Sequence, residues 1–180
     1  MRLFHFSEDP GIACFAPRPV RVPAARPPGQ EWLNGPLVWA IAEPHARLYL
    51  FPRDCPRIVV WATAQSSAAD RARWLGDLAP GVQAVAYVER DWLARIGAAT
   101  VYRYELPAAP FRSLDDAGMH VSTQAVQPLA VHAVYDLRQA LEASGTALRP
   151  VGTLSPLRPL WQSTLHASGI RLRHAAGWSD

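Results

Sequence analysis

Short apolar runs separated by polar and proline-rich stretches dominate the chain, and they predict a sheet of several short strands. Residues 37–41, and 57–62 after the initial Arg57, are continuous in apolar side chains, as in strands that are covered on both faces. Residues 100–106 alternate instead, which is typical of a strand with one buried face. The same criteria predict further strands at 2–6, 82–88, 119–122 and 148–151, and one at 126–134 that Pro128 interrupts.

Helical spacing is confined to short segments between these strands. Pro44 suits the first turn of a helix that ends near residue 50, because its missing N–H is not needed there. Ser67 is expected to cap a helix that ends near residue 78, and Asp136 one that Gly145 stops. The inner face of the first of these two is expected to carry Ala68, Ala72, Leu75 and Leu78. Shorter helices are expected at 91–96 and 157–167.

Strands outnumber helices, and the helices are short and interspersed. This pattern predicts the α+β class with a mixed, mostly antiparallel sheet. A chain of 180 residues is expected to form a single domain with a true core, here over about 1–138, with a C-terminal helical extension over about 139–180. Residues 16–36 contain six prolines and predict a loop without regular structure, of a length typical of lids and binding loops. This segment and the loop around Arg53 are the expected walls of any cleft.

The charge pattern narrows the classes of partner. All 18 basic residues are Arg, and with the heavy use of Ala and Pro they are typical of a GC-rich bacterial genome. They are also spread along the chain and form no block, so the pI near 9.2 is discounted as a sign of nucleic-acid binding, and nucleic acid is not expected as a partner. No apolar run reaches the roughly 20 residues of a membrane helix, and the N-terminus lacks a secretory signal, which predicts a cytoplasmic protein. Cys14 and Cys55 have no metal-ligand spacing and are expected to be reduced thiols.

No motif of a common nucleotide site, hydrolase or zinc protease occurs: GxGxxG, GxxxxGK[ST], GxSxG and HExxH are all absent. Chemistry-bearing side chains nevertheless follow several of the predicted strands. They are His5, Tyr49, Arg53, Asp115, Asp116 and Gln124. Each also has a structural interpretation: a hydrogen-bonded histidine, a core tyrosine, or aspartates that form a turn beside Gly118.

Five stretches, HFSEDP, VWAI..PHA.LY, FPRDCPR, YRYELP and VSTQAVQPL, together resemble a family of short bacterial proteins known as a domain of unknown function. The resemblance covers roughly residues 2–138. At a further remove the layout resembles the ADP-ribosyltransferase superfamily, and within it the small rifampin-modifying branch. That resemblance implies an ADP-ribosyltransferase-like fold, NAD as cofactor, and an enzyme that transfers ADP-ribose to an unknown acceptor.

The resemblance also implies roles for single residues. His5 would hydrogen-bond the nicotinamide ribose and Tyr49 would stack on the nicotinamide ring. Phe6 and Ser7 stand where that branch has Gly-Thr, and the bulk of Phe6 crowds the approach of the dinucleotide. Arg53 would complete the cofactor-binding set.

The catalytic set that the resemblance implies is acidic but incomplete. Asp115 or Asp116 would steady the positive charge that develops at the ribose carbon as the glycosidic bond breaks. Gln124 stands where toxin-like members carry the catalytic acid. Because Gln124 is neutral, it supplies a hydrogen bond to ribose and no charge.

Two other classes of protein fit the same residues. In one, a phosphate- or nucleotide-binding pocket resembling that of RNA 2′-phosphotransferases is formed by His5, Arg53 and either Arg57 or Arg103. In the other, Arg53 and Asp54 form an ion pair that locks a turn of a non-catalytic binding or toxin-neutralising module. The enzyme requires His5, Tyr49 and a carboxylate in one cleft. Anion binding requires at least two converging arginines with no carboxylate beside the ligand, and the structural class requires a buried pair of Arg53 and Asp54 with no pocket nearby.

Overall fold

The computed structural model describes residues 1–178, and the chain forms two compact units that are described here one at a time. Unit 1 contains Met1–Ala46 and Val101–Ala133, and unit 2 contains Arg47–Thr100 and Val134–Asp180. The protein belongs to the α+β class: its strands pair mostly antiparallel and its helices are short. None of the helices within the described residues is long and apolar enough to cross a membrane. The predicted boundary near residue 138 stays a prediction.

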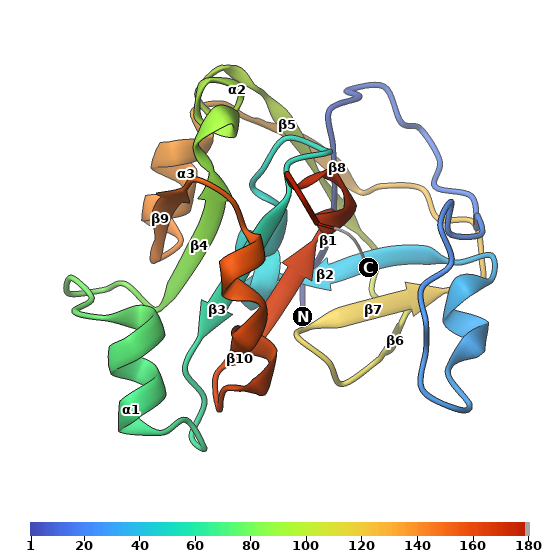
Figure 1. Ribbon diagram of the computed structural model, residues 1–180. Helices are drawn as coiled ribbons and strands as arrows, with labels where there is room; N and C mark the ends of the chain where they lie inside the picture. The colour runs from blue at the N-terminus through green and yellow to red at the C-terminus, as the bar shows by residue number, and fades with distance from the viewer. Residues whose placement is uncertain (179–180) are drawn as a thin grey trace. The chain divides into compact units, whose positions relative to one another are not determined.

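Unit 1 is organised around a six-stranded sheet in the order β6-β7-β2-β1-β5-β8. Its strands are β1 (Leu3–Ser7), β2 (Val38–Ala42), β5 (Val101–Leu106), β6 (Arg112–Ser113), β7 (Met119–Ser122) and β8 (Ala130–Val134). β2 pairs antiparallel with both β1 and β7, and β7 with β6, as Figure 1 shows for the three strands β2, β7 and β6. Except for β6, each of these strands overlaps a segment whose apolar pattern predicts a strand.

The two faces of this sheet are covered differently. One face carries Leu3, Val38, Ala40, Tyr104 and Leu106, which pack into the main cluster of the unit. The opposite face carries Val121 and the partly buried Trp39, which pack with Leu33 and Leu37. Leu33 belongs to the short 3₁₀ helix η1 (Glu31–Asn34) inside the proline-rich segment. Residues 16–36 therefore contain regular structure that was not predicted, and they cover one face of the sheet.

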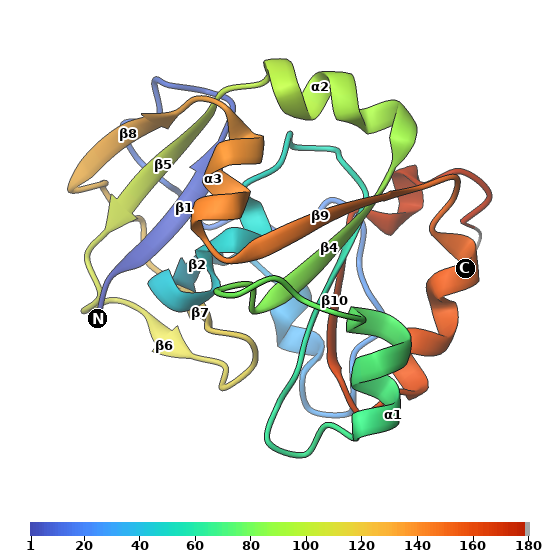
Figure 2. The ribbon, with the colours of Figure 1, turned by 90° about the vertical axis from the view of Figure 1, so that its left-hand side faces the viewer.

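Unit 2 has its own four-stranded sheet, so the chain forms two sheets where the sequence predicts one. The order is β10-β3-β4-β9, with β3 (Arg57–Trp61), β4 (Ala84–Glu89), β9 (Thr146–Val151) and β10 (His166–Ile170). β4 and β9 run parallel, side by side in Figure 2, and the other two pairings are antiparallel. Four of the five β3 residues and all six β4 residues are buried, as the continuous apolar runs predict.

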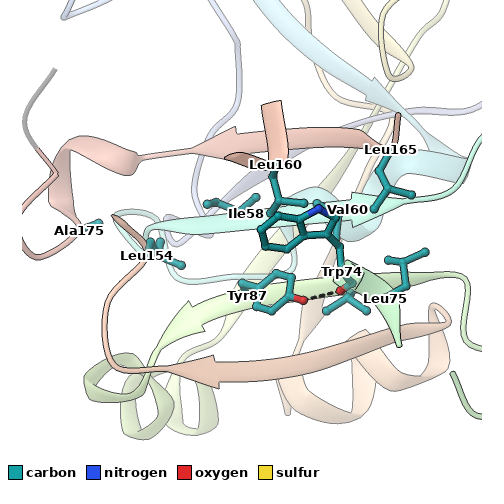
Figure 3. Packing of buried hydrophobic residues seen from close by; sticks show 10 residues of the cluster. Ile58, Val60, Trp74, Leu75, Tyr87, Leu154, Leu160, Leu165 and Ala175 are labelled. Carbon is teal, nitrogen blue, oxygen red and sulfur yellow. Dashed lines mark hydrogen bonds between the residues drawn. The ribbon is translucent and has the colours of Figure 1, made fainter. Parts of the chain in front are cut away.

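Helices of several kinds surround this sheet. They are η2 (Glu43–Tyr49, which begins at the end of unit 1), α1 (Ala68–Asp70), η3 (Arg71–Leu75), η4 (Arg90–Trp92), α2 (Leu93–Ala98), α3 (Leu137–Ala143), η5 (Ser155–Gln162) and η6 (Leu172–His174). Figure 3 shows the core on one face, where Trp74, Tyr87 and Leu160 pack against Ile58 and Val60. The hydroxyl of Tyr87 donates a hydrogen bond to the carbonyl of Trp74.

The residues predicted to cap helices do so in the structure, whereas the predicted inner face of one helix is only partly right. Asp136 accepts a hydrogen bond from the amide of Gln139, and Gly145 follows the helix with a φ of 69°. Ser67 likewise caps α1, but the helix continues in π geometry through η3. Of the predicted inner face, Leu75 is buried and Leu78 packs against the core, whereas Ala68 and Ala72 are exposed and Trp74 is buried in their place. The predicted helix over 157–167 ends at Gln162, and its last residues belong to β10.

Candidate ligand-binding cavity

His5, the first residue of the predicted cofactor site, lies on β1 of unit 1. Its Nδ1 is 2.9 Å from the carbonyl oxygen of Trp39, and its ring centroid is 4.7 Å from that of Phe15. Because a carbonyl only accepts, Nδ1 carries the proton in this hydrogen bond. The side chain is partly buried between a backbone group and an aromatic ring, a position typical of a structural histidine.

Phe6 and Ser7 follow at the end of the same strand. Ser7 is buried, and its hydroxyl accepts a hydrogen bond from the amide of Asp9. The hydroxyl of Tyr104 donates to the carbonyl of Asp9 at 2.6 Å and accepts from the amide of Ile12 at 3.1 Å. The segment after β1 is therefore held by one local hydrogen bond and by two from Tyr104 on β5.

The acidic residues form the turn between β6 and β7. Asp115 has a φ of 53°, and its amide and carboxylate both bond the hydroxyl of Ser113. Asp115 thus serves the turn, as the structural interpretation predicts. The next residue, Asp116, is exposed and lines a cavity. Gln124 lies beyond β7, where its amide donates to the hydroxyl of Ser122.

Tyr49 and Arg53 belong to unit 2. Tyr49 ends η2 with its ring centroid 5.7 Å from the guanidinium carbon of Arg57. Arg53 is exposed, and Asp54 pairs with His174 at 3.7 Å. The structure therefore pairs Asp54 with a histidine, where the sequence suggests a turn locked by Arg53.

Arg57 is the residue that locks this turn, and sequence reasoning assigned it no such role. Its Nε and Nη2 donate to the carbonyl of Leu48 at 3.0 and 2.8 Å, and its Nη1 donates to the carbonyl of Cys55 at 2.9 Å. Its guanidinium carbon lies 4.9 Å from the ring centroid of Phe51. Only 3% of the residue is exposed, and this burial lowers the pKa of Arg57 to about 10. Burial also raises the pKa of the Cys55 thiol to about 12.

Unit 1 contains a cavity of about 450 Å³ between the proline-rich segment and the β6–β7 hairpin. The proline-rich segment contributes Arg26, Gln30 and Trp32, as predicted for one wall of a cleft, whereas the Arg53 loop, the other predicted wall, contributes nothing to this lining. Strand β2 contributes Trp39, and the hairpin contributes Arg112. We call this space the Arg–Trp cavity, after Arg26, Arg112, Trp32 and Trp39.

Two arginines in the Arg–Trp cavity lie against tryptophan rings. The guanidinium carbon of Arg112 is 3.8 Å from the ring centroid of Trp32, and that of Arg26 is 6.0 Å from the ring centroid of Trp39. The buried Nε of Arg26 has no hydrogen-bond partner within residues 1–178. Buried donors are nearly always paired in proteins, so this unpaired N–H group is an exception within the residue that lines the cavity.

Of the predicted site residues, only Asp116 lines the Arg–Trp cavity. Ser113 and Gln30 add a hydroxyl and an amide to its lining. A second space of about 400 Å³ lies along the same hairpin and shares Arg112. Neither lining includes His5 or Gln124. The sequence signal for this site was the proline-rich segment itself, whereas the converging arginines are far apart along the chain.

Comparison with models of known protein families shows to which family the chain belongs. The family of unknown function DUF6886 matches residues 4–175. The chain belongs to this family. Membership of DUF6886 confirms the prediction drawn from the HFSEDP, FPRDCPR and YRYELP motifs, whereas the more distant resemblance to ADP-ribosyltransferases stays a prediction. Searches of curated proteins and of solved structures found no match.

Proposed function

We propose that this DUF6886 protein binds a planar, anionic small molecule of the nucleotide class in the Arg–Trp cavity of unit 1. The observation that carries the proposal is the convergence of Arg26 and Arg112, each beside a tryptophan ring, on one cavity of about 450 Å³. Sites for small molecules commonly have volumes of about 300–1,000 Å³ and combine aromatic walls with a few polar groups.

The side chains supply the three interactions that such a ligand needs. Guanidinium groups bind phosphate or carboxylate oxygens through paired N–H donors, and a stacked guanidinium keeps its edge available for them. The indole rings of Trp32 and Trp39 offer faces on which a base can stack. Asp116, Ser113 and Gln30 can accept or donate hydrogen bonds at the base or sugar.

NAD and ADP-ribose fall within this ligand class, since both combine an adenine ring with a pyrophosphate. An ADP-ribosyltransferase-like fold and transfer of ADP-ribose therefore remain predictions from the resemblance, with His5 and Tyr49 in the roles given above. The support from geometry is for binding, because the lining of the Arg–Trp cavity includes Asp116 but neither His5 nor Tyr49.

Calorimetric titration of the purified protein with AMP, adenosine, ADP-ribose and NAD tests the proposal. We expect AMP to bind more tightly than uncharged adenosine, and Arg26→Ala or Arg112→Ala to weaken AMP binding by about 10- to 100-fold, the loss of one charge-assisted hydrogen bond. Arg73→Ala is the matched control, since Arg73 lies 4.6 Å from the ring centroid of Trp74 in unit 2. Absence of binding at millimolar AMP, or equal losses in the control, contradicts the proposal.

The His5→Ala variant separates binding in the Arg–Trp cavity from the transferase prediction. If nucleotides bind only in the cavity, His5→Ala retains the affinity for AMP and NAD. If NAD binding disappears in His5→Ala while Arg112→Ala retains it, the cofactor site predicted from the resemblance is supported and the cavity is not. Release of nicotinamide from NAD, followed by chromatography, then reports whether any catalysis occurs.

A further inference from the structure

A second cavity of unit 1 continues the Arg–Trp cavity along the β6–β7 hairpin, which Figure 1 shows in yellow. It is the space of about 400 Å³ that shares Arg112, and residues 109–112 and 121–123 line it on the side away from the hairpin turn. The Arg–Trp cavity takes residues 112–114, 116 and 119 from the same hairpin, toward the turn. The two spaces therefore follow one another along the hairpin and adjoin at Arg112. We call the second space the Pro–Phe cavity, after Pro110 and Phe111.

Arg112 lies at the junction of the two cavities. Its guanidinium carbon is 3.8 Å from the ring centroid of Trp32, and the residue is exposed. Within the described residues 1–178 its guanidinium forms no hydrogen bond and no ion pair. Because a stacked guanidinium keeps its N–H edge available, it can donate to two oxygens of a phosphate. A phosphate held at Arg112 has the Arg–Trp cavity on one side and the Pro–Phe cavity on the other.

The Pro–Phe cavity differs from the Arg–Trp cavity in chemistry. Among the described residues, Arg112 is the one charged residue in its lining. Phe111 and the buried Val121 give it apolar surface, and Ser122 and Thr123 contribute hydroxyl groups. An aromatic ring beside hydroxyl groups suits a sugar, which packs a C–H face on the ring and forms hydrogen bonds through its own hydroxyls. A second nucleobase would find no indole face in this lining, and a further phosphate would find no second cation.

We propose that the ligand of these adjoining cavities is a nucleotide sugar, with its phosphates at Arg112 and its sugar in the Pro–Phe cavity. This inference rests on the proposed function, from which it takes the base beside the tryptophans and the phosphate at the arginines. It goes further by assigning a neutral, hydroxyl-rich group to the far side of the phosphate. A mononucleotide would leave the space of about 400 Å³ beside its phosphate unfilled.

Calorimetric titration of the full chain with ADP, ADP-glucose and diadenosine pyrophosphate tests this inference. ADP-glucose carries less negative charge than ADP, because its glucose esterifies the terminal phosphate. If the arginines alone decided the affinity, ADP would therefore bind more tightly than ADP-glucose. We expect ADP-glucose to bind about 10-fold more tightly than ADP, through the contacts of its sugar in the Pro–Phe cavity.

Substitutions at exposed positions of the Pro–Phe cavity locate the effect. Ala109→Trp fills part of the space and is expected to remove the advantage of ADP-glucose, while ADP binds as before. Ala13→Trp is the matched control and keeps the advantage, because Ala13 is an exposed alanine of unit 1 outside both linings. Thr123→Val removes one hydroxyl at nearly constant volume and is expected to weaken ADP-glucose binding by about 3- to 10-fold. An advantage that persists in Ala109→Trp overturns the inference.

This inference and the proposed function fail in different ways. Binding of ADP without any advantage for ADP-glucose overturns the nucleotide-sugar assignment and leaves the proposed function in place. A gain over ADP for diadenosine pyrophosphate alone overturns the assignment of the second group to a sugar. Absence of binding by AMP, ADP and ADP-glucose at millimolar concentrations overturns both. An advantage that is lost in Ala109→Trp and kept in Ala13→Trp supports the sugar in the Pro–Phe cavity.

Discussion

Arginines lie in opposite environments in the two units. In unit 1, Arg112 is exposed, lies against Trp32 at 3.8 Å and lines an open cavity. In unit 2, Arg57 is buried, and its donors are used on the carbonyls of Leu48 and Cys55. Both side chains lie near aromatic rings, so the ring contact does not distinguish them. The surroundings of the guanidinium N–H groups do distinguish them. An arginine whose N–H groups bind backbone carbonyls is structural, whereas one that lines an accessible cavity can bind a ligand.

The largest expected effect is the loss of stability when the buried Arg57 is replaced. Arg57→Ala leaves two buried carbonyls without their charged donor and removes packing against Phe51. We expect the free energy of unfolding to fall by about 3 kcal/mol or more, measured by urea denaturation. Arg57→Lys is the informative second variant, because it keeps the charge but not the fork that reaches both carbonyls. A loss below 1 kcal/mol in Arg57→Ala would show that this arginine is not structural.

A smaller loss in the free energy of unfolding is expected when Gly118 is replaced in the β6–β7 hairpin, beside the Arg–Trp cavity. Gly118 has a φ of 70°, and a Cβ there would lie 2.7 Å from Nδ1 of His45. Gly118→Ala is therefore expected to cost about 1–3 kcal/mol in urea denaturation. Gly29→Ala is the control, since Gly29 also has a positive φ of 83° but open space around it. Equal losses in both variants would show that backbone strain alone, and not the contact with His45, is responsible.

The third prediction uses the buried thiol beside Arg57. The pKa of Cys55 is raised from 9.0 to about 12 in the folded protein, so the unfolded chain loses this proton first as the pH rises. Stability is therefore lost above pH 9, by about 1 kcal/mol between pH 9 and 10. Arg57, with its pKa lowered to about 10, acts in the opposite direction over the same range.

Comparison with Cys55→Ala isolates the thiol from Arg57. Urea denaturation at pH 8, 9 and 10 is expected to show a steeper loss in the parent than in the variant, and parallel curves would contradict the assignment. Alkylation by iodoacetamide gives a second readout. Cys14 is exposed and is expected to react in the folded protein, whereas Cys55 reacts only after unfolding.

The smallest expected effect is the change in stability when the exposed Arg112 is replaced. Arg112→Ala is expected to change the free energy of unfolding by less than about 0.5 kcal/mol, because its exposed guanidinium holds no backbone group in place. The same variant is expected to lose nucleotide affinity, which calorimetry measures. Destabilisation comparable to that of Arg57→Ala would remove the distinction between the two arginines.

Strands and helix caps could be predicted where their signals are local. The continuous apolar run at 57–62 and the alternation at 100–106 gave β3 and β5, and Asp136 capped α3, because each depends on neighbours along the chain. The π geometry of η3 escaped prediction, since burial of Trp74 against the sheet overrides the spacing of small apolar residues.

The candidate site also has features that the sequence predicted and features that it could not predict. The prolines of 16–36 marked the wall of a cavity from sequence alone, and the turn at Asp115 and Asp116 was expected beside Gly118. Arg26 and Arg112 are 86 positions apart and have no shared motif, so no spacing argument could join them. The cofactor role of His5 came from a resemblance and stays a prediction; the contact of its Nδ1 with the carbonyl of Trp39 depends on the pairing of β1 with β2 and could not be predicted.

The sequence by itself determined the α+β class, most strands, the helix caps and the family, because apolar periodicity and capping chemistry act over a few residues. Only the tertiary structure decided that the strands form two sheets, that Arg57 is buried, and that Arg26 and Arg112 converge beside tryptophans. Those features depend on pairing between distant segments. Whether an arginine is structural or available to a ligand depends on which carbonyls and rings the fold brings to it.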